Sequence, residues 1–344
     1  MMPVDLRSDT VTRPTQAMRA AMAAAEVGDD QYGEDPTTNQ LQDRVAELLG
    51  HEAALWLPSG TMANQVALRV LTRPGDDVIV SREAHAVWHE AGGSAANAGV
   101  QLTEIGARGA FGIHEFLAAI KPRGLDIFPP TTLVEIENTH NRAGGIVVPQ
   151  PDVESVCAAA RARGIATFLD GARLWNAAVA SGRTLEALAK PFDLVAVSLS
   201  KGLGAPGGSL LAGAKTLIGR AVRHRRMLGG AMRQTGIYAA AGLYAIDQHV
   251  ARLADDHANA RAIAELLAES AAIEIDLASV QTNIVVFRLR RAEAPAFVAA
   301  ARAAGVLVNA LGPRTVRALT HLDVDATQCR SAAEVLLRIA DASP

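Results

Sequence analysis

The residues best suited to chemistry in this sequence are a lysine and an aspartate that each end a short apolar run. Lys201 follows the run Phe192–Leu199 and precedes a loop rich in glycine. A lysine at the end of a buried strand is poorly hydrated, which lowers its pKa and makes its amine available for a Schiff base. Asp170 follows the run Ile165–Leu169, and a carboxylate there can hold the protonated ring nitrogen of a cofactor. The structural alternatives are a lysine that reaches solvent and an aspartate that caps the next helix.

An anion site at the start of a helix is the third candidate. Ser59, Gly60 and Thr61 follow Pro58 and open a helix that we expect to run to Leu71. The first N–H groups of a helix are free, so that together with two hydroxyls they suit a phosphate. Ordinary N-capping by Ser59 would require the same residues.

Arginines beside glycines or strand ends are candidates to bind a substrate carboxylate. They are Arg173, Arg233, Arg314 and Arg317. A guanidinium binds a carboxylate through two parallel hydrogen bonds, as recognition of an amino acid requires. For any one of them, the alternative is an ordinary solvated surface arginine.

Two histidines are candidates for proton transfer. His85 precedes His89 by four residues, with Glu90 beside them, but no third ligand follows at a spacing typical of metal sites, so we expect no metal. A flat imidazole that stacks on a cofactor ring or acts as a general base suits His85 better. His140 comes after the run Thr132–Ile136 and is expected at the same edge of the sheet.

The elements that must position these residues alternate between helix and strand. Helical patterns from about residue 35 to about 230 are separated by short apolar runs. These runs are Asp77–Val80, Gln101–Ile105, Thr132–Ile136, Ile165–Leu169, Leu194–Leu199 and Ser209–Ala212. Runs that are apolar on both faces and bounded by Gly, Pro or Asp are typical of buried parallel strands. We therefore expect an α/β fold with helices on both faces of a mainly parallel sheet, whose ligands bind at the carboxyl ends of the strands.

The pattern changes in the last third of the chain. One long helix is expected from Gly236 to about Ser270, followed by shorter strands and helices that end in a helix near Ala332–Ala342. A chain of 344 residues exceeds what one core usually accommodates. We expect a large domain over residues 16–250 and a smaller α+β C-terminal domain over residues 251–344.

Composition argues against several classes of partner and location. The formal net charge is −3 and aromatic residues make up 4 %, so that nothing favours binding to nucleic acid. No run approaches the roughly 18 apolar residues that a membrane span requires, and the N-terminus does not resemble a signal peptide. Two distant cysteines, Cys157 and Cys329, are typical of reduced thiols in a cytoplasmic protein.

Eight ordered motifs together resemble those of the low-specificity L-threonine aldolases, over nearly the whole chain. The motifs are residues 5–14 (DLRSDTVTRP), 32–36 (YGEDP), 57–64 (LPSGTMAN), 137–140 (ENTH), 169–173 (LDGAR), 198–203 (SLSKGL), 229–234 (GGAMRQ) and 319–323 (LTHLD). The resemblance implies the fold-type I architecture of pyridoxal-5′-phosphate (PLP) enzymes, similar to aspartate aminotransferase. It also implies a homotetramer built as a dimer of dimers with shared active sites.

Carried over by position, the resemblance implies a role for each candidate residue. Lys201 would bind PLP as a Schiff base, with Asp170 at the pyridine nitrogen and His85 stacked on the ring. The phosphate would lie against Ser59, Gly60, Thr61 and, from a neighbouring subunit, Arg233. The substrate carboxylate would be bound by Ser8, Arg173 and Arg317, of which Arg173 also borders the cofactor. His140 would approach the substrate hydroxyl, and Tyr32 would border the site. Residues 1–15 would therefore contribute to the active site.

The function expected from this resemblance is PLP-dependent aldol cleavage of L-threonine, L-allo-threonine and related β-hydroxy-α-amino acids to glycine and an aldehyde. The base that takes the hydroxyl proton stays open between His85, His140 and a water molecule. The alternative within the fold is β-elimination or transamination of amino acids. Gly202, Gly204 and Gly207 also fit the dinucleotide pattern of an oxidoreductase, weakly, because Pro206 interrupts it. A catalytically silent binding or assembly protein is a further class.

Overall fold

A seven-stranded sheet forms the centre of the part of the chain that the computed structural model describes, residues 3–342. Its order is β2-β8-β7-β6-β5-β3-β4. The strands are β2 (Ala53–Leu57), β3 (Asp77–Ser81), β4 (Gln101–Ile105), β5 (Thr131–Glu137), β6 (Ala166–Gly171), β7 (Leu194–Ser198) and β8 (Ser209–Gly213). The pairs from β4 to β7 are parallel, whereas β8 runs antiparallel to both β2 and β7. β7 and β8 are buried throughout, as the apolar runs predicted.

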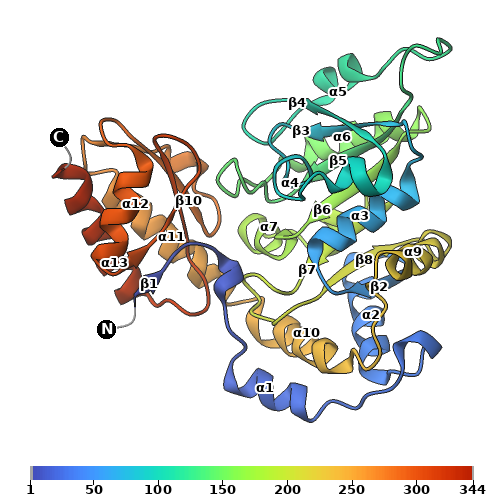
Figure 1. Cartoon of the computed structure of the whole chain (residues 1–344), viewed down its shortest axis with the longest axis horizontal. Coiled ribbons are helices and arrows are strands. Elements are labelled where there is room, and N and C mark those ends of the chain that lie inside the picture. Colours follow the sequence, from blue (N-terminus) through green and yellow to red (C-terminus); the bar gives the residue numbers. More distant parts are fainter. Residues whose placement is uncertain (1–2, 343–344) are drawn as a thin grey trace.

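Helices cover both faces of this sheet (Figure 1). One core lies between the sheet and two helices, α3 (Gly60–Leu71) and α9 (Lys215–Met227). The other core joins the opposite face to a second group of helices. That group comprises α2 (Pro36–Leu49), α5 (Ile113–Ala119), α6 (Gln150–Arg161), α7 (Leu174–Ser181), α8 (Leu185–Ala189) and α10 (Gly236–His249). The expected α/β fold with a mainly parallel sheet is confirmed.

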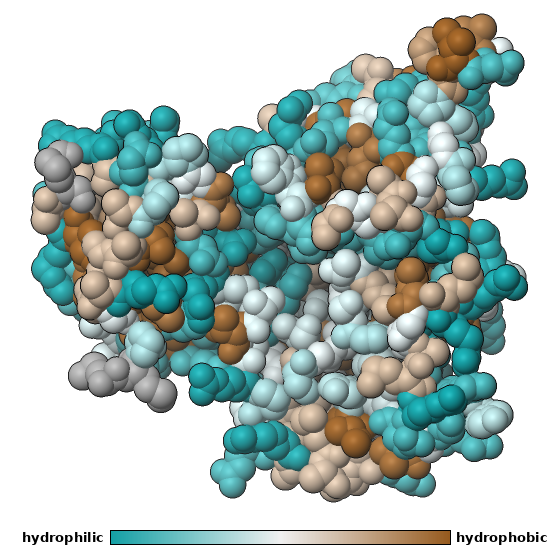
Figure 2. Space-filling view, viewed as in Figure 1, coloured by the Kyte–Doolittle hydropathy of each residue, from teal (hydrophilic) through white to brown (hydrophobic). Residues whose placement is uncertain are grey.

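The C-terminal part has its own antiparallel sheet and its own core. The sheet order is β12-β13-β10-β9. The elements are α11 (Leu253–Leu267), β9 (Ile273–Glu274), β10 (Ile284–Leu289), α12 (Ala294–Ala303), β11 (Val306–Leu307), β12 (Asn309–Ala310), β13 (Thr315–Leu319) and α13 (Ala326–Asp341). Figure 2 shows a hollow between this part and the rest of the molecule, with hydrophilic surface on its floor.

The first residues of the chain join these two parts. β1 (Val4–Asp5) pairs in parallel with β11, and the buried Leu6 belongs to the C-terminal core. The chain then crosses to the large sheet, where α1 (Gln16–Ala23) packs against α10. Of the expected N-terminal segment, residues 1 and 2 lie outside the described residues, as do residues 343 and 344 at the other end.

Two expectations about the elements were wrong, and one strand was not expected. The single helix over 236–270 is two helices, α10 and α11, because the chain leaves the helix at residues 250–252. There the ring of His249 bonds to the carbonyl of Leu203 at 2.7 Å, which holds the end of α10 against the glycine-rich loop. β2 was missed, since a short apolar run has no period that separates strand from helix. The last helix begins earlier than expected, at a capping box of Asp325 and Gln328.

Candidate active site

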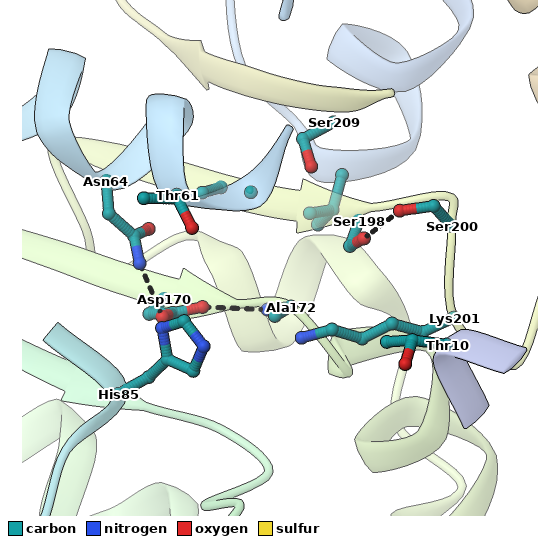
Figure 3. Close-up of a pocket in the computed structure, with 13 residues that line it drawn as sticks. Thr10, Thr61, Asn64, His85, Asp170, Ala172, Ser198, Ser200, Lys201 and Ser209 are labelled. Carbon is teal, nitrogen blue, oxygen red and sulfur yellow. Dashed lines mark hydrogen bonds between the residues drawn. The ribbon is translucent and has the colours of Figure 1, made fainter. Parts of the chain in front are cut away.

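The carboxyl ends of β5, β6 and β7 bring the candidate residues together. Glu137 at the end of β5 is paired with Asp170 on β6, and Asp170 is paired with Ala196 on β7. Lys201 follows β7 by three residues. A cavity of about 210 Å³ opens at this edge, and both Asp170 and Lys201 line it. In Figure 3 the amine of Lys201 extends toward the end of β6, where the ring of His85 lies beside Asp170.

The amine of Lys201 is suited to act as a nucleophile. Burial lowers its pKa, and the nearby charge of Arg173 lowers it further. Within residues 3–342, no carboxylate forms an ion pair with this amine. The hydroxyl of Thr12 donates to the carbonyl of Lys201 at 2.9 Å, so that the N-terminal segment fixes the backbone at this residue.

Asp170 and His85 belong to one hydrogen-bonded network. The carboxylate of Asp170 accepts hydrogen bonds from Nδ2 of Asn64 at 2.8 Å and from the backbone N–H of Ala172 at 3.0 Å. The same Nδ2 donates to Oε1 of Glu90 at 2.7 Å, and Nδ1 of His85 lies 2.9 Å from that oxygen. Burial alone would lower the pKa of His85, but the bond to Glu90 and the charge of Asp170 raise it above its ordinary value.

The sequence offered no third metal ligand near His85, and here the structure differs. His85, Glu90 and Asp170 present ligand-type atoms within 4.8 Å of one another. Asp170 joins the pair because β6 ends beside the turn that carries them. Amide groups of Asn64 and Gln65 already donate to these carboxylates. The arrangement is therefore a hydrogen-bonded network.

The start of α3 forms an anion cup on the cavity wall. Ser59 caps the helix by accepting from the N–H of Met62, and Gly60 and Thr61 line the cavity with the first N–H groups of the helix. Across from them, the hydroxyl of Ser209 is buried and has no hydrogen-bond partner among the described residues. An unsatisfied hydroxyl beside a helix N-terminus fits a phosphate group.

These residues together fit PLP. A lysine amine, a carboxylate for the ring nitrogen and a cup for the phosphate are the three groups that hold this cofactor, and Lys201, Asp170 and Thr61 all line one cavity. Asp170 also receives two hydrogen bonds that fix its orientation. The donor set therefore matches the cofactor on the chemistry of the side chains alone.

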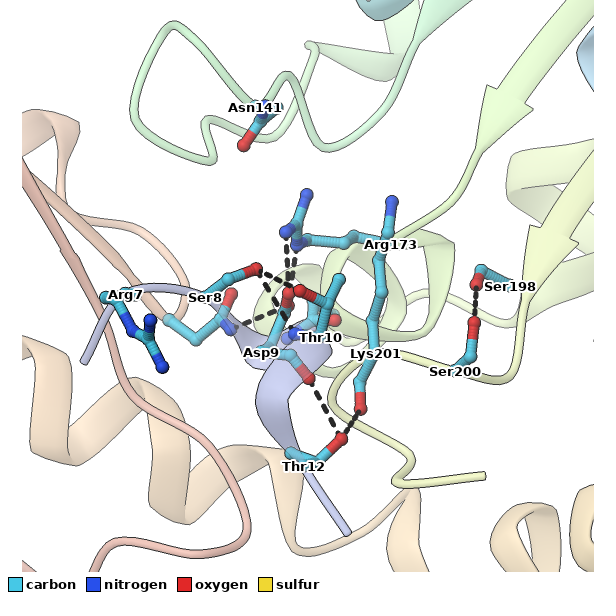
Figure 4. A network of polar contacts seen from close by, with 12 residues as sticks. Arg7, Ser8, Asp9, Thr10, Thr12, Asn141, Arg173, Ser198, Ser200 and Lys201 are labelled. Carbon is cyan, nitrogen blue, oxygen red and sulfur yellow. Dashed lines mark hydrogen bonds and ion pairs between the residues drawn. The ribbon is translucent and has the colours of Figure 1, made fainter. Parts of the chain in front are cut away.

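Two neighbouring arginines, Arg173 and Arg317, lie beside the site, although neither lines the cavity of Lys201 and Asp170. Arg173 is buried and binds Asp9 through Nε and Nη2, at 2.7 Å each (Figure 4). Nη1 of Arg317 donates to Oδ1 of Asn141 at 2.8 Å, whereas its buried Nε has no partner within the described chain. Burial and the charge of Arg173 lower the pKa of Arg317 to about 10. A guanidinium without a carboxylate partner is suited to bind an anionic ligand.

Glu137 fixes both segments that carry the candidate histidines. Its carboxylate accepts from the backbone N–H of His85 and from that of Asn141, each at 2.8 Å. His140 itself is fully buried and is absent from the cavity lining. Its Nδ1 accepts from the N–H of Ala143 at 3.2 Å, and its Nε2 lies 3.8 Å from Glu137. Of the two histidines, His85 is the one that reaches the cavity.

The remaining predicted residues lie in two places. Ser8 caps the turn that presents Asp9, by accepting from the N–H of Thr10 at 3.2 Å. Arg233 and Tyr32 are exposed and do not line this cavity. Their loops are adjacent, since the N–H of Asp30 donates to the carbonyl of Arg233 at 3.1 Å. The two residues therefore share one surface of the chain.

The sequence analysis did not assign a function to several residues of the site. They are Asp9, Asn64, Glu90, Glu137, Ser209 and Asn283. Asn64 lies four residues after Gly60 on one helix, so that helical spacing alone could have placed it on the cavity side. Nothing local distinguishes Asn283, which bonds to Asp9 at 3.1 Å across 274 residues of sequence.

The glycine-rich loop does not have the geometry of a dinucleotide site. Residues 202–208 lead into β8, an antiparallel strand, and no helix opens there. The pyrophosphate of a dinucleotide needs the N-terminus of a helix directly after the glycines. The structure therefore disfavours the oxidoreductase alternative.

Comparisons with known proteins agree with this geometry. The model of the beta-eliminating lyase family matches residues 5–290. The low-specificity L-threonine aldolase of Escherichia coli K12 is 46 % identical over 327 residues, which cover 94 % of this chain and 96 % of the relative. Low-specificity L-threonine aldolase 1 of Arabidopsis thaliana is 42 % identical over 289 residues, with 83 % and 81 % covered.

Solved structures show the same fold. Threonine aldolase of Leishmania major superposes with a TM-score of 0.84 at 21 % identity, over 98 % of this chain and 100 % of the other. Serine palmitoyltransferase of Sphingomonas wittichii gives 0.77 at 16 % identity, over 99 % and 89 %. The fold is therefore that of fold-type I PLP enzymes. Within residues 3–342, no helix combines the length and the apolar character that crossing a bilayer requires. From the family match and the close relatives, the chain belongs to the beta-eliminating lyases and, among these PLP-dependent enzymes, to the low-specificity L-threonine aldolase family.

Proposed function

We propose that this protein cleaves L-threonine, L-allo-threonine and related β-hydroxy-α-amino acids into glycine and an aldehyde, with PLP as its cofactor. The observation that carries the proposal is one cavity lined by both Lys201 and Asp170, from adjacent strand ends, with the charge of Arg173 close enough to lower the pKa of Lys201. The names of the relatives from Escherichia coli and Arabidopsis thaliana support the same substrate class.

The chain's own residues would hold the cofactor at three points. Lys201 would attach it through its amine as a Schiff base, Asp170 would pair with its ring nitrogen, and Ser59, Gly60 and Thr61 would bind its phosphate. Ser209, whose hydroxyl is unsatisfied, is a further donor for that phosphate. When bound, PLP supplies an electron-accepting ring that takes up the electron pair of a breaking bond at the substrate Cα.

The substrate carboxylate would bind between the two arginines and Ser8. Asp9 occupies Nε and Nη2 of Arg173, which leaves Nη1 to donate to a ligand. Arg317 contributes its unpaired Nε. Fixing the carboxylate fixes the orientation of the bonds at Cα, so that the Cα–Cβ bond is the one aligned for cleavage.

His85 is the better placed of the two histidines to accept the proton of the β-hydroxyl. Its Nδ1 is engaged with Glu90, which leaves Nε2 as the acceptor on the cavity side. His140 is enclosed by its own loop and by Glu137, so that its role is to keep that loop in place. Wild-type turnover in a His85→Asn variant would exclude His85 as an essential base.

We further propose that the protein works in the cytoplasm as a homotetramer built as a dimer of dimers. The exposed and adjacent positions of Arg233 and Tyr32 support shared sites, in which both residues border the cavity of the neighbouring subunit. The free Cys157 and Cys329 accord with a reducing location. Separate hydrophobic clusters support a division near residue 250 into a large and a small domain.

The first experiment combines a spectrum with a product assay. The purified protein is expected to show the visible band of lysine-bound PLP, and Lys201→Ala is expected to lose it. Added L-allo-threonine should release acetaldehyde and glycine. Pyruvate with ammonia would instead indicate β-elimination, and a 2-oxo acid would indicate transamination. A protein that shows no band after addition of PLP would refute the proposal.

A further inference from the structure

Glu90 is absent from the cavity lining, yet its carboxylate bonds to two residues that line the cavity, Asn64 and His85. Oε1 accepts from Nδ2 of Asn64 at 2.7 Å and lies 2.9 Å from Nδ1 of His85. Oε2 accepts from Nε2 of Gln65 at 2.6 Å. The side chain is fully buried. We propose that Glu90 is a positioning residue, which fixes the tautomer of His85 and ties that ring, through Asn64, to Asp170.

The first step of the argument concerns which nitrogen of His85 carries the proton. The amide nitrogens of Asn64 and Gln65 can only donate, so that both oxygens of Glu90 act as acceptors. An accepting oxygen 2.9 Å from Nδ1 requires a proton on Nδ1. Nε2 of the neutral ring is then free to accept a proton on the cavity side. Glu90 thereby orients the base as the third group of a catalytic triad does.

The second step concerns Asp170. Nδ2 of Asn64 has two hydrogens, and it gives one to Glu90 and the other to Asp170. With both hydrogens used, the amide of Asn64 cannot turn without losing a buried hydrogen bond. Glu90 therefore acts on one of the two hydrogen bonds that orient the Asp170 carboxylate, through the amide of Asn64.

The backbone around Glu90 is consistent with a fixed geometry. Glu83 and Ala91 have φ values of 60° and 52°, in the left-handed region that residues with a Cβ rarely occupy. They flank the segment that carries both His85 and Glu90. Strained positions persist only where the surroundings determine them, and they gather at functional sites.

Other charged groups also face His85, and they set how far its titration can move. They are Glu137 at the end of β5, Asp170 at the end of β6, Lys201 after β7 and His89 directly after the short helix α4 (His85–Trp88). Asp170 and Glu137 favour the protonated ring, and Lys201 opposes it. Among the described residues, Glu90 provides the carboxylate that bonds to the side chain of His85. Replacing Glu90 by glutamine removes the negative charge, while the amide oxygen of glutamine can still accept the hydrogen bond from Nδ1.

The test compares Glu90→Gln with the wild-type holoenzyme. We expect kcat to fall by about 10-fold or more, as for partners that orient a functional histidine, with KM little changed. The limb of the pH–rate profile that reports His85 should move to lower pH, because the neighbouring negative charge is lost. In the background of His85→Asn, Glu90→Gln should lower kcat by a smaller factor than in the wild type, since the route through the His85 ring is already lost and only the route through Asn64 to Asp170 is left.

A second measurement does not depend on turnover. The visible band of the bound cofactor is titrated with pH, and its midpoint is expected to move to lower pH in Glu90→Gln. Asp77→Asn is the matched control: Asp77 is an equally buried carboxylate, bonded to Thr103 and Thr131 at the opposite end of β3. It should lower the thermal midpoint without moving either pH midpoint.

The outcomes separate this inference from the proposed function on which it rests. Absence of aldehyde release by the wild type would remove the proposed function, but the spectral titration would still test Glu90. Unchanged pH midpoints, or an effect fully additive with His85→Asn, would overturn the positioning role. If Glu90→Gln does not fold, Glu90→Asp replaces it: the charge stays and the reach shortens, so kcat should fall while the pH midpoints stay near those of the wild type. A wild-type kcat in Glu90→Asp would also overturn the inference.

Discussion

The site has an acidic side, formed by Asp170, Glu90 and Asn64, and an arginine side, formed by Arg173 and Arg317. The two sides satisfy the hydrogen bonds of their polar groups in different ways. On the acidic side, Asp170 and Glu90 both accept hydrogen bonds from the amide of Asn64. On the arginine side, Arg173 is paired with a carboxylate, but the buried Nε of Arg317 has no partner in the described chain. In the first region the carboxylates of Asp170 and Glu90 have hydrogen-bond donors within the chain, whereas the second region has donors left over.

This difference indicates what each region does. Groups that are fully bonded before a ligand arrives do not have to reorganise during a reaction, which suits the side that holds a cofactor in one orientation. A buried donor without an acceptor costs free energy in the empty protein, and a bound carboxylate recovers it. The arginine side is therefore built for a ligand that comes and goes.

The largest effect is expected when the acidic side loses its central charge. Asp170→Asn keeps the shape of the side chain but removes the negative charge that the cofactor nitrogen requires. We expect kcat to fall on the order of 10³-fold, which is typical for loss of one preorganised interaction at a reacting centre. Steady-state kinetics measure this, with thermal unfolding as the control for folding. A variant with kcat within a factor of ten of the wild type would contradict this role.

The next effect concerns the buried ion pair between Arg173 and Asp9 on the arginine side. Asp9→Asn leaves Arg173 buried without its carboxylate, which should destabilise the protein by about 3–5 kcal/mol in denaturant unfolding. Burial would raise the pKa of Asp9, but Arg173 holds it well below its usual range. The contribution is therefore present above the unfolded pKa of about 3.9 and is lost as the pH falls through the lower folded value.

Two observations check the prediction for Asp9. The difference in stability between variant and wild type should be constant from pH 7 to about pH 5 and should shrink only in more acidic solution. Asp276→Asn removes an exposed partner of Arg108 and should leave stability unchanged. Equal effects of the two substitutions would mean that burial of the Asp9 pair does not matter.

A smaller effect is expected when the unpaired hydrogen-bond donor of Arg317 is removed. Arg317→Gln deletes the guanidinium whose Nε is without a partner in the described chain, and a charge-assisted hydrogen bond contributes about 1.5–3 kcal/mol. We expect kcat/KM to fall by about 10- to 150-fold, mostly through KM. Arg314→Gln is the control, since Arg314 pairs with Glu293 on the surface. A loss confined to kcat would assign Arg317 to the chemical step and not to carboxylate binding.

The smallest effect tests Glu135, a carboxylate on the acidic side that has no hydrogen-bond donor among the described residues. Both oxygens of Glu135 are buried and lack a partner within residues 3–342, and burial, with Asp170, Glu90 and Glu137 nearby, raises its pKa well above the ordinary value. Stability from this group is present below the unfolded pKa of about 4.3 and is lost as the pH rises. Glu135→Gln should therefore be more stable than the wild type by about 1 kcal/mol at pH 7.

The pH dependence of that gain identifies its cause. Unfolding measured from pH 4 to pH 8 should show the advantage of Glu135→Gln growing with pH, whereas Glu334→Gln, an exposed substitution on α13, should show none. A constant difference across this range would mean that the Glu135 carboxyl does not titrate on unfolding.

The sequence was informative where chemistry depends on neighbouring strand ends. Lys201 and Asp170 could be expected together because each ends an apolar run, and parallel strands place their carboxyl ends at one edge. The anion cup at Ser59 followed from helix N-terminal geometry alone. The contact between Arg173 and Asp9 spans 164 residues, and no local pattern carries such information.

What could not be predicted depends on tertiary packing. His140 follows its strand as expected, yet the loop closes over it, and a residue's place in the sequence does not report which way its ring is enclosed. The network of Glu90 and Asn64 needs α3 and the segment after β3 to meet, which periodicity does not encode. Arg233 lies on the surface of its own chain, so that only an assembly could bring it to a cavity.

The N-terminal crossing has a consequence for how the protein is made. Val4 pairs with Val306, and the carbonyl of Asp5 meets the ring of His321, 316 residues later in the chain. During synthesis Val4 and Asp5 leave the ribosome long before Val306 and His321, and they find these partners only after the C-terminal part has emerged. Asp9 and Thr12, which follow directly, reach Arg173 and Lys201 from this anchor. A partly synthesised chain can therefore form the large sheet while its carboxylate-binding arginine still lacks its partner, so the site is completed last.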